Sequence, residues 1–366
     1  MEHPENDDLY KGLKVNKGVA DVPTVNPYLK KRIKRKEYTP AEFVEGILKG
    51  NITILSQAVT LVESSKYEHQ QVAQEIIEKC LPHAGKSVRI GITGVPGAGK
   101  STSIDAFGMH LIRQGRKLAV LAIDPSSERS KGSILGDKTR MEALSREKNA
   151  FIRPSPSAGS LGGVARKTRE TIVLCEAAGF DTIFVETVGV GQSETAVHSM
   201  VDFFLLIQLA GTGDELQGIK RGIMEMADGI IINKADGDNL EKAKLAAAQF
   251  RNALHLFPAP ESGWFPKVLT YSGYYNLGIK EIWDMVGEYM EFTQKNGYFN
   301  YKRNEQAKYW MYESINDTLR ETFYHNPAVE KMLNFTEQKV LNNEISSFVA
   351  AKRMMDLFLE NLSAKK

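Results

Sequence analysis

Eight consecutive residues form a pattern whose chemistry is the binding of phosphate groups. The run Gly94-Val95-Pro96-Gly97-Ala98-Gly99-Lys100-Ser101 matches G-x-x-x-x-G-K-[ST] at every fixed position. Its glycines let the backbone curl so that successive N–H groups point at phosphate oxygens, and a following helix adds its N-terminal dipole. Lys100 would reach the β- and γ-phosphates, and the Ser101 hydroxyl would ligate Mg²⁺. A strand-like run precedes the motif and a helical run follows, so we expect Gly94 to Thr102 to bind a nucleoside triphosphate.

A second motif indicates the base. Asn233-Lys234-Ala235-Asp236 follows the apolar run 228–232, at the end of a predicted strand. The Asp236 carboxylate would accept hydrogen bonds from guanine N1–H and the 2-amino group, whereas adenine offers no such donor pair. A site of this kind rejects the analogue by roughly 10⁴-fold or more. Another strand, 267–271, leads to Ser272 and Gly273, where the Ser272 backbone N–H could reach guanine O6.

Acidic residues at strand ends supply candidate ligands for the metal ion. Asp124 follows the predicted strand 118–123, and Glu186 lies near the end of the strand 182–187. Carboxylates beside a phosphate-binding loop hold Mg²⁺ directly or through water. Asp137 lies in a polar loop that could close over the same metal.

The chemistry expected at this site is attack of water on the γ-phosphate. Lys100, Mg²⁺ and backbone N–H groups would neutralise the developing charge. Gly189 is a candidate γ-phosphate sensor, because a backbone N–H can approach closely where no side chain intrudes; here Glu-x-x-Gly replaces the Asp-x-x-Gly of many GTPases. Gln192 is a candidate for orienting the water, although polar residues at a helix start usually have a structural role.

The elements that position these residues alternate between strand and helix. Apolar runs predict strands at 88–93, 118–123, 150–153, 182–187, 202–209, 228–233 and 267–271, and helical periodicity marks 163–178, 239–256 and 278–294. Strands that are apolar on both faces belong to a parallel sheet covered by helices. This is the doubly wound α/β pattern of P-loop NTPases, in which ligands bind at the carboxyl ends of the strands.

We divide the 366 residues into four parts: a polar, basic arm (1–36), a helical extension (37–86), a GTPase domain (87–295) and a helical C-terminal region (296–366). The run Lys30 to Lys36 is interpreted as a solvated arm rather than a site for nucleic acid or acidic lipid. Near the C-terminus, Phe348, Ala351, Met355, Phe358 and Leu362 follow a heptad-like spacing. Such a stripe packs either within its own chain or against a second copy, and we favour a homodimer.

The composition fits a soluble enzyme. The chain is 42% hydrophobic and 25% charged, with a net charge of +2 that favours no polyanionic partner. Cys80 and Cys175 lie far apart, so neither a disulfide framework nor a zinc ribbon is indicated. We find no apolar stretch long enough to span a membrane. An acidic beginning, with Glu2, Glu5, Asp7 and Asp8, is unlike a targeting peptide, so we expect a cytoplasmic location.

Four runs together resemble the MeaB/ArgK family, the G-protein chaperones of adenosylcobalamin-dependent acyl-CoA mutases that include the methylmalonic aciduria type A protein. They are Gly94 to Ser101, the turn 124–127 (DPSS), the run 186–194 (ETVGVGQSE) and the run 211–220 (GTGDELQGIK). The resemblance extends over about residues 40 to 295.

This resemblance implies a fold of the signal-recognition/MinD-like GTPase class, with an N-terminal helical extension and a C-terminal dimerisation arm. It implies Mg²⁺ held around Ser101, Asp124, Asp137 and Glu186, and switch loops near 124–140 and 186–198. A third switch around 210–220 would respond to the partner through Lys220. The implied client is an adenosylcobalamin-dependent mutase, with methylmalonyl-CoA mutase preferred.

Other classes predict different sequence features. A kinase or ATPase of basic amino-acid transport would use ATP, which Asn233-Lys234-Ala235-Asp236 disfavours. A nickel-insertion GTPase would favour a His-rich tract or paired Cys, but the seven His are scattered. A partitioning ATPase carries an extra lysine where this chain has Val95, and a targeting GTPase would need a Met-rich domain.

Overall fold

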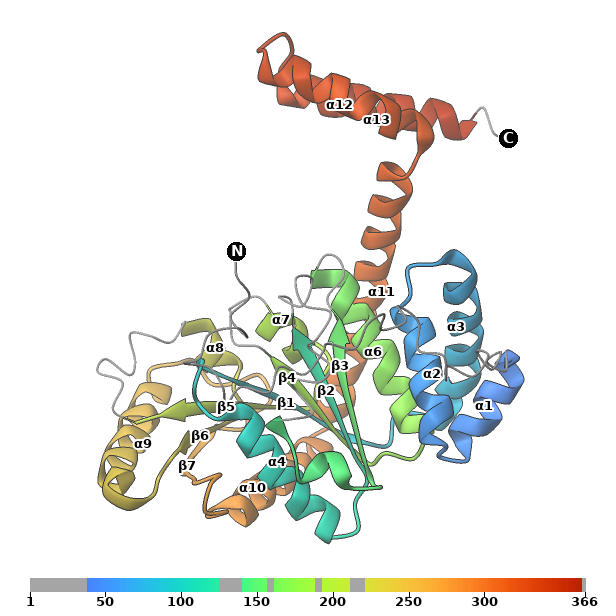
Figure 1. Ribbon diagram of the computed structural model, residues 1–366. Coiled ribbons are helices and arrows are strands. Elements are labelled where there is room, and N and C mark those ends of the chain that lie inside the picture. Colours follow the sequence, from blue (N-terminus) through green and yellow to red (C-terminus); the bar gives the residue numbers. More distant parts are fainter. Residues whose placement is uncertain (1–37, 125–139, 157–160, 188–192, 211–220, 364–366) are drawn as a thin grey trace, which may run out of the picture. The chain divides into compact units, whose positions relative to one another are not determined.

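The computed structural model of the protein describes residues 38–124, 140–156, 161–187, 193–210 and 221–363. Its centre is a seven-stranded sheet in the order β3-β2-β4-β1-β5-β6-β7 (Figure 1). The strands are β1 (Val88–Gly94), β2 (Leu118–Asp124), β3 (Ala150–Pro156), β4 (Thr182–Thr187), β5 (Phe203–Leu209), β6 (Gly229–Asn233) and β7 (Lys267–Thr270). Every neighbouring pair is parallel, so the predicted doubly wound sheet and its seven strands are confirmed.

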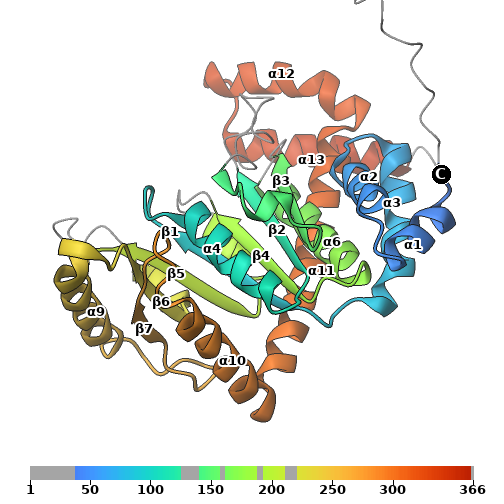
Figure 2. The ribbon, with the colours of Figure 1, turned by 60° about the horizontal axis from the view of Figure 1, so that its bottom comes forward.

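Helices cover both faces of this sheet. The helices α4 (Lys100–Arg113) and α10 (Ile279–Lys295) cover one face, where they enclose a core with Leu205 and Ile207 of β5 (Figure 2). The alternate residue Leu206 points to the other face, into a core with α9 (Leu240–Leu254). On that second face also lie α6 (Leu161–Ala177), α7 (Ser193–His198) and α8 (Arg221–Met226). The alternation of side chains along a strand is why each strand is apolar on both faces.

Three helices at the N-terminal side pack against α6: α1 (Pro40–Leu48), α2 (Ile52–Glu63) and α3 (Tyr67–Cys80). Glu63, at the end of α2, forms an ion pair with Arg153 of β3, and its carbonyl accepts a 2.9 Å hydrogen bond from Lys167 of α6. Cys80 and Cys175 are free and buried, as expected of core residues. Short 3-10 turns occur at Leu81–His83, Leu144–Arg146 and Gly237–Asn239.

The C-terminal part consists of a long helix, α11 (Tyr298–Tyr324), and a helical pair, α12 (Pro327–Leu341) and α13 (Ser347–Ser363). Val329 of α12 packs with Met354 and Phe358 of α13. Of the five residues in the predicted stripe, only Phe358 is buried, because α13 turns the face of Ala350, Met354 and Phe358 toward α12. Four of the five stripe residues, Phe348, Ala351, Met355 and Leu362, are exposed and do not contribute to the core of this chain. Within the described ranges, no helix is both long and apolar enough to cross a membrane.

Candidate nucleotide-binding site

The phosphate-binding motif forms the turn between β1 and α4, at the carboxyl edge of the sheet. Gly97 and Gly99 have φ angles of +79° and +84°, in the left-handed region that glycine adopts without strain. Gly99 is the N-cap of α4, and no side chain caps the amides of that first turn. These N–H groups and the helix dipole make the turn a suitable site for phosphate oxygens.

Lys100, the first residue of α4, lies against the phosphate-binding turn. Its ammonium donates hydrogen bonds to the carbonyls of Gly94 at 2.8 Å and Val95 at 3.4 Å. Burial lowers the pKa of Lys100, while the negative charges of Glu186 and Glu194 act to raise it. A polyphosphate would offer this ammonium stronger, charged acceptors than the two carbonyls that it contacts here.

Two of the four predicted metal ligands are brought together. Ser101 Oγ lies 3.4 Å from Oε1 of the buried Glu186. Glu186 reaches this position because β4 lies between β1 and β2, with Glu186 beside Ile92 and Ala122 in register. A hydroxyl and a carboxylate are hard oxygen donors of the kind that Mg²⁺ prefers.

The other two predicted metal ligands are Asp124 and Asp137. Asp124 ends β2 at the same edge of the sheet, but its side chain, like all of Asp137, lies outside the described residues. Among the described side chains, no group of three or more His, Cys, Asp or Glu forms a potential metal cluster.

Asn233 connects the guanine motif to two other loops. Its Nδ2 donates a 2.7 Å hydrogen bond to the carbonyl of Ala98, in the phosphate-binding turn. Its Oδ1 accepts from the backbone N–H groups of Lys234 at 2.7 Å and Gly273 at 3.2 Å. Lys234 has a positive φ of 59°, a conformation that is uncommon outside glycine and often marks a functional site. One buried amide therefore fixes the relative positions of the three segments.

Asp236 is held by a residue from the next loop. The hydroxyl of Ser272, which is fully buried, donates to Asp236 Oδ2. The Ser272 backbone N–H, which the sequence suggested for guanine O6, instead donates to the carbonyl of Leu277 at 3.0 Å. This difference arises because residues 272 and 277 form an antiparallel bridge that closes the loop. Ser272 thus contacts the Asp236 carboxylate, the candidate for base recognition, through its hydroxyl.

Comparisons with known proteins identify the family. A family model described as "Methylmalonyl Co-A mutase-associated GTPase MeaB" matches residues 55–328, which include both motifs. The chain belongs to the MeaB family.

Individual relatives agree with this assignment. The chain is 44% identical to "GTPase ArgK" of Escherichia coli, over 87% of this chain and 97% of that protein. It is 45% identical to "Methylmalonic aciduria type A homolog, mitochondrial" of Mus musculus, over 86% of this chain and 78% of that protein. A crystal structure titled "LAO/AO transport system kinase" superposes with a TM-score of 0.70 at 38% identity, covering 88% of this chain and 99% of the other. The protein is therefore a GTPase of the MeaB family.

Several residues expected to serve this MeaB-family GTPase lie outside the described residues. They are the candidate sensor Gly189, the candidate water-positioning Gln192 and Lys220 in the third switch. The basic run Lys30 to Lys36, interpreted as a solvated arm, also lies outside the described residues.

One functional candidate did not emerge from the sequence. Glu194, in the first turn of α7, is buried, and its charge acts on Lys100. An acid in the first turn of a helix is ordinarily explained by the helix dipole, so the sequence carried no signal that the charge of Glu194 would act to raise the pKa of Lys100.

Proposed function

We propose that this GTPase is a chaperone of an adenosylcobalamin-dependent acyl-CoA mutase, with methylmalonyl-CoA mutase the preferred client. GTP hydrolysis would gate cofactor loading and protect the mutase. The observation that carries this proposal is the match to the MeaB model, whose description names the mutase. The identity to the mouse methylmalonic aciduria type A homologue supports the same client.

We also propose that hydrolysis depends on Mg²⁺. Ser101, Asp124, Asp137 and Glu186 would hold the ion, and the close pair of Ser101 and Glu186 oxygens fits it. Bound there, Mg²⁺ would neutralise charge on the β- and γ-phosphate oxygens. Lys100 would move from the Gly94 carbonyl to the phosphates, while Asp236 would bind the guanine edge.

The client is expected to accelerate hydrolysis. The switch motifs contain no residue that can be assigned as an arginine finger, so unassisted turnover should be slow, on the order of 10⁻⁴ to 10⁻² s⁻¹, with a gain of roughly 10³-fold when a partner completes the site. Lys220 is the proposed transmitter of this effect. By reciprocity, the bound nucleotide must also alter the affinity for the mutase.

The test is GTP turnover measured with and without purified methylmalonyl-CoA mutase from the same organism, for the wild type and Lys220→Ala. We expect the mutase to accelerate the wild type, and the variant to keep its basal rate but lose most of the acceleration. If no cobalamin-dependent mutase of that organism changes the GTP turnover of the wild type, the chaperone assignment is overturned, while the GTPase activity stands.

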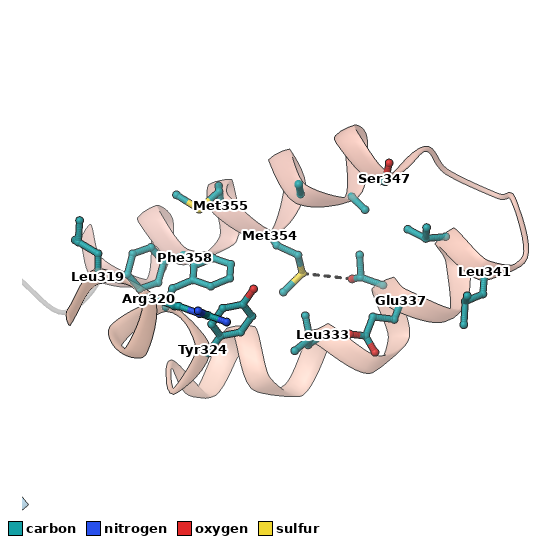
Figure 3. A pocket seen from close by; sticks show the side chains of 15 residues that line it. Leu319, Arg320, Tyr324, Leu333, Glu337, Leu341, Ser347, Met354, Met355 and Phe358 are labelled. Atoms are coloured by element: carbon teal, nitrogen blue, oxygen red, sulfur yellow. Dashed lines mark hydrogen bonds between the residues drawn. The ribbon is translucent and has the colours of Figure 1, made fainter. Parts of the chain in front are cut away.

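We further propose that the C-terminal helices form a homodimer interface. Apolar side chains remain exposed along α11 and α13, including Tyr312, Leu319, Phe348, Met355 and Leu362, and Phe348 is 87% exposed. An apolar groove of about 720 Å³ lies between α12, α13 and the end of α11 (Figure 3). Apolar faces of this extent are typical of protein–protein contacts. Four of the five residues of the predicted stripe on α13, all except Phe358, belong to this exposed surface.

Sedimentation velocity tests the interface. The wild type should sediment as a dimer at micromolar concentration, and Phe348→Asp should sediment as a monomer with unchanged basal GTPase activity. The matched control is Lys352→Asp, an exposed position one turn along the same helix. A wild-type monomer, or a Phe348→Asp variant that remains fully dimeric, would contradict the proposed interface.

An amino-acid transport kinase is the alternative that the related structure's title supports. It predicts phosphoryl transfer to a protein rather than to water, and use of ATP. Equal calorimetric affinities for ATP and GTP would favour this alternative, whereas selective binding of guanine nucleotides supports the mutase chaperone.

A further inference from the structure

The helix α7 follows β4, which ends at the same edge of the sheet as the phosphate-binding turn, and its carboxyl end contacts the C-terminal helix α11. It has only six residues, Ser193–His198, and so spans about 9 Å. At its first turn, six residues after Thr187 ends β4, Ser193 and Glu194 are buried, and the negative charge of Glu194 acts to raise the pKa of Lys100. The residues that follow its last turn, 199–202, lead directly into β5.

Two side chains of α11 hold the carboxyl end of α7. Trp310 Nε1 donates a 3.0 Å hydrogen bond to the carbonyl of Ser199. Gln306 Nε2 donates to the carbonyl of Val201 at 2.8 Å and lies 3.4 Å from that of His198. Trp310 and Gln306 are buried, at 6% and 5% exposure, and lie four residues apart on one face of α11. Carbonyls at the end of a helix need partners from outside it, and α11 supplies them.

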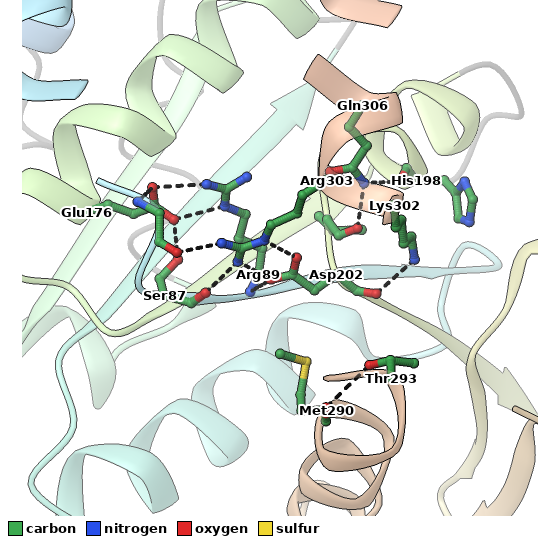
Figure 4. A network of polar contacts seen from close by, with 12 residues as sticks. Ser87, Arg89, Glu176, His198, Asp202, Met290, Thr293, Lys302, Arg303 and Gln306 are labelled. Atoms are coloured by element: carbon green, nitrogen blue, oxygen red, sulfur yellow. Dashed lines mark hydrogen bonds and ion pairs between the residues drawn. The ribbon is translucent and has the colours of Figure 1, made fainter. Parts of the chain in front are cut away.

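The same face of α11 is fixed to the sheet by charges one turn earlier (Figure 4). Arg303 donates to both carboxylate oxygens of Asp202, at 2.8 and 2.7 Å, and to the carbonyl of Ser87 at 2.7 Å. Lys302 donates to the backbone carbonyl of Asp202 at 2.8 Å. Asp202 Oδ2 also accepts the backbone N–H of Arg89, in β1, at 2.9 Å. Breaking buried charge pairs is costly, so α11 provides a fixed support.

The helix α7 also lies directly on the central strand. A Cβ atom on Gly91 of β1 would come within 2.7 Å of Phe204, 2.9 Å of Val197 and 3.0 Å of Val201. The absence of a side chain at Gly91 therefore allows the end of α7 to approach the strand. A short helix packed this closely transmits a displacement of one end to the other, because close-packed interiors deform little.

We propose that Gln306 and Trp310 are positioning residues for GTP hydrolysis: they hold the carboxyl end of α7 and thereby hold Glu194 relative to Lys100. The inference rests on the GTPase activity at the phosphate-binding turn and not on the identity of the client. The positioning residues thus lie on α11, the helix that leads into α12 and α13.

The test uses two variants that remove a donor but keep the shape, Trp310→Phe and Gln306→Met. Loss of a single neutral hydrogen bond corresponds to a decrease in kcat of about threefold to tenfold. We expect the Kd for GDP to stay within about twofold of wild type, because neither residue contacts the phosphate-binding turn or the guanine motif. Tyr312→Phe, at an exposed position on the same helix, is the control and should change neither quantity.

A double-mutant cycle with Glu194→Gln separates positioning from general destabilisation. If Gln306 and Trp310 act through Glu194, their substitution in the Glu194→Gln background should reduce kcat by less than twofold further. Fully additive losses, or unchanged kcat in both folded single variants, would overturn the proposal. If Gln306→Met fails to fold, Trp310→Phe in the same cycle decides the outcome, since its ring still fills the site.

Discussion

Asn233 Nδ2 donates a 2.7 Å hydrogen bond to the carbonyl of Ala98, and this bond connects the base-recognition motif to the phosphate-binding turn. The two residues are 135 positions apart in the chain. The contact is close enough that a Cβ atom on Gly99 would lie only 2.6 Å from Asn233 Nδ2. The Asn233-Lys234-Ala235-Asp236 segment and the phosphate-binding turn are therefore joined by one buried hydrogen bond.

Replacing Asn233 should weaken GTP and GDP binding alike. Asn233→Ala leaves the buried Ala98 carbonyl and the Gly273 N–H without their partner, and each such loss costs about 1–3 kcal/mol. We expect calorimetric affinities for both nucleotides to fall by at least about tenfold. Asn239→Ala, which removes an exposed hydrogen bond in the same loop, is the control. Unchanged nucleotide affinity in Asn233→Ala would show that the phosphate-binding turn keeps its conformation without the Asn233 hydrogen bond.

Asp236 is expected to decide the base. Asp236→Asn should shift the preference from guanine toward xanthine nucleotides, because the amide offers a donor where the carboxylate offered an acceptor. The neighbouring exposed Asp238→Asn is the matched control and should leave the preference unchanged. Competition binding with GDP, XDP and ADP measures the effect.

The Ser272 hydroxyl should strengthen this recognition. Ser272→Ala removes the hydrogen bond to Asp236 and leaves the backbone bridge to Leu277 in place. We expect GDP affinity to fall about threefold to tenfold, as for one lost hydrogen bond, with ADP binding unaffected. Equal loss for both nucleotides would mean that Ser272 supports the loop rather than the carboxylate.

Lys100 and the two oxygen donors beside it should have separable roles. Lys100→Ala should abolish hydrolysis, because it removes the charge that stabilises the developing γ-phosphate charge. Ser101→Ala and Glu186→Ala should instead raise the Mg²⁺ concentration needed for half-maximal activity. Mg²⁺ titrations of GTP turnover distinguish these effects. A titration that is the same in both variants as in the wild type would place the cation elsewhere.

His198 should make the fold sensitive to acid. Burial, and secondarily the nearby Lys302 charge, lowers the pKa of His198 from 6.5 to about 3. Between these values the unfolded chain binds a proton that the folded protein does not, so stability falls as the pH falls below about 6.5. The contribution of His198 corresponds to about 1.5 kcal/mol lost between pH 6.5 and 5.

Urea unfolding at these two pH values measures that loss. His198→Gln, which cannot titrate, should lose less stability over this interval than the wild type by that amount. The exposed His325→Gln is the control. Identical losses in His198→Gln and the wild type would show that other groups cause the acid sensitivity.

The sequence by itself determined the sheet, the family and the positions of two motifs at the carboxyl edge of the sheet. Apolar runs specified all seven strands, because burial between two helical layers favours apolar residues on both faces of a strand. The phosphate and guanine motifs were equally readable, since each is a local sequence with a fixed relation to the strand before it.

Only the tertiary structure decided how distant residues act together. The Ser272 hydroxyl reaches Asp236 across 36 positions, and Arg303 reaches Ser87 across 216. Likewise, Glu194 looks like an ordinary helix-start acid until the folded structure shows that its charge acts to raise the pKa of Lys100. On α13, the orientation of the helix about its axis decides that Met354 is buried and the adjacent Met355 is exposed. Local sequence patterns determine which helices and strands form. Which side chains contact one another depends on how those elements pack, and the spacing of residues along the sequence does not specify that packing.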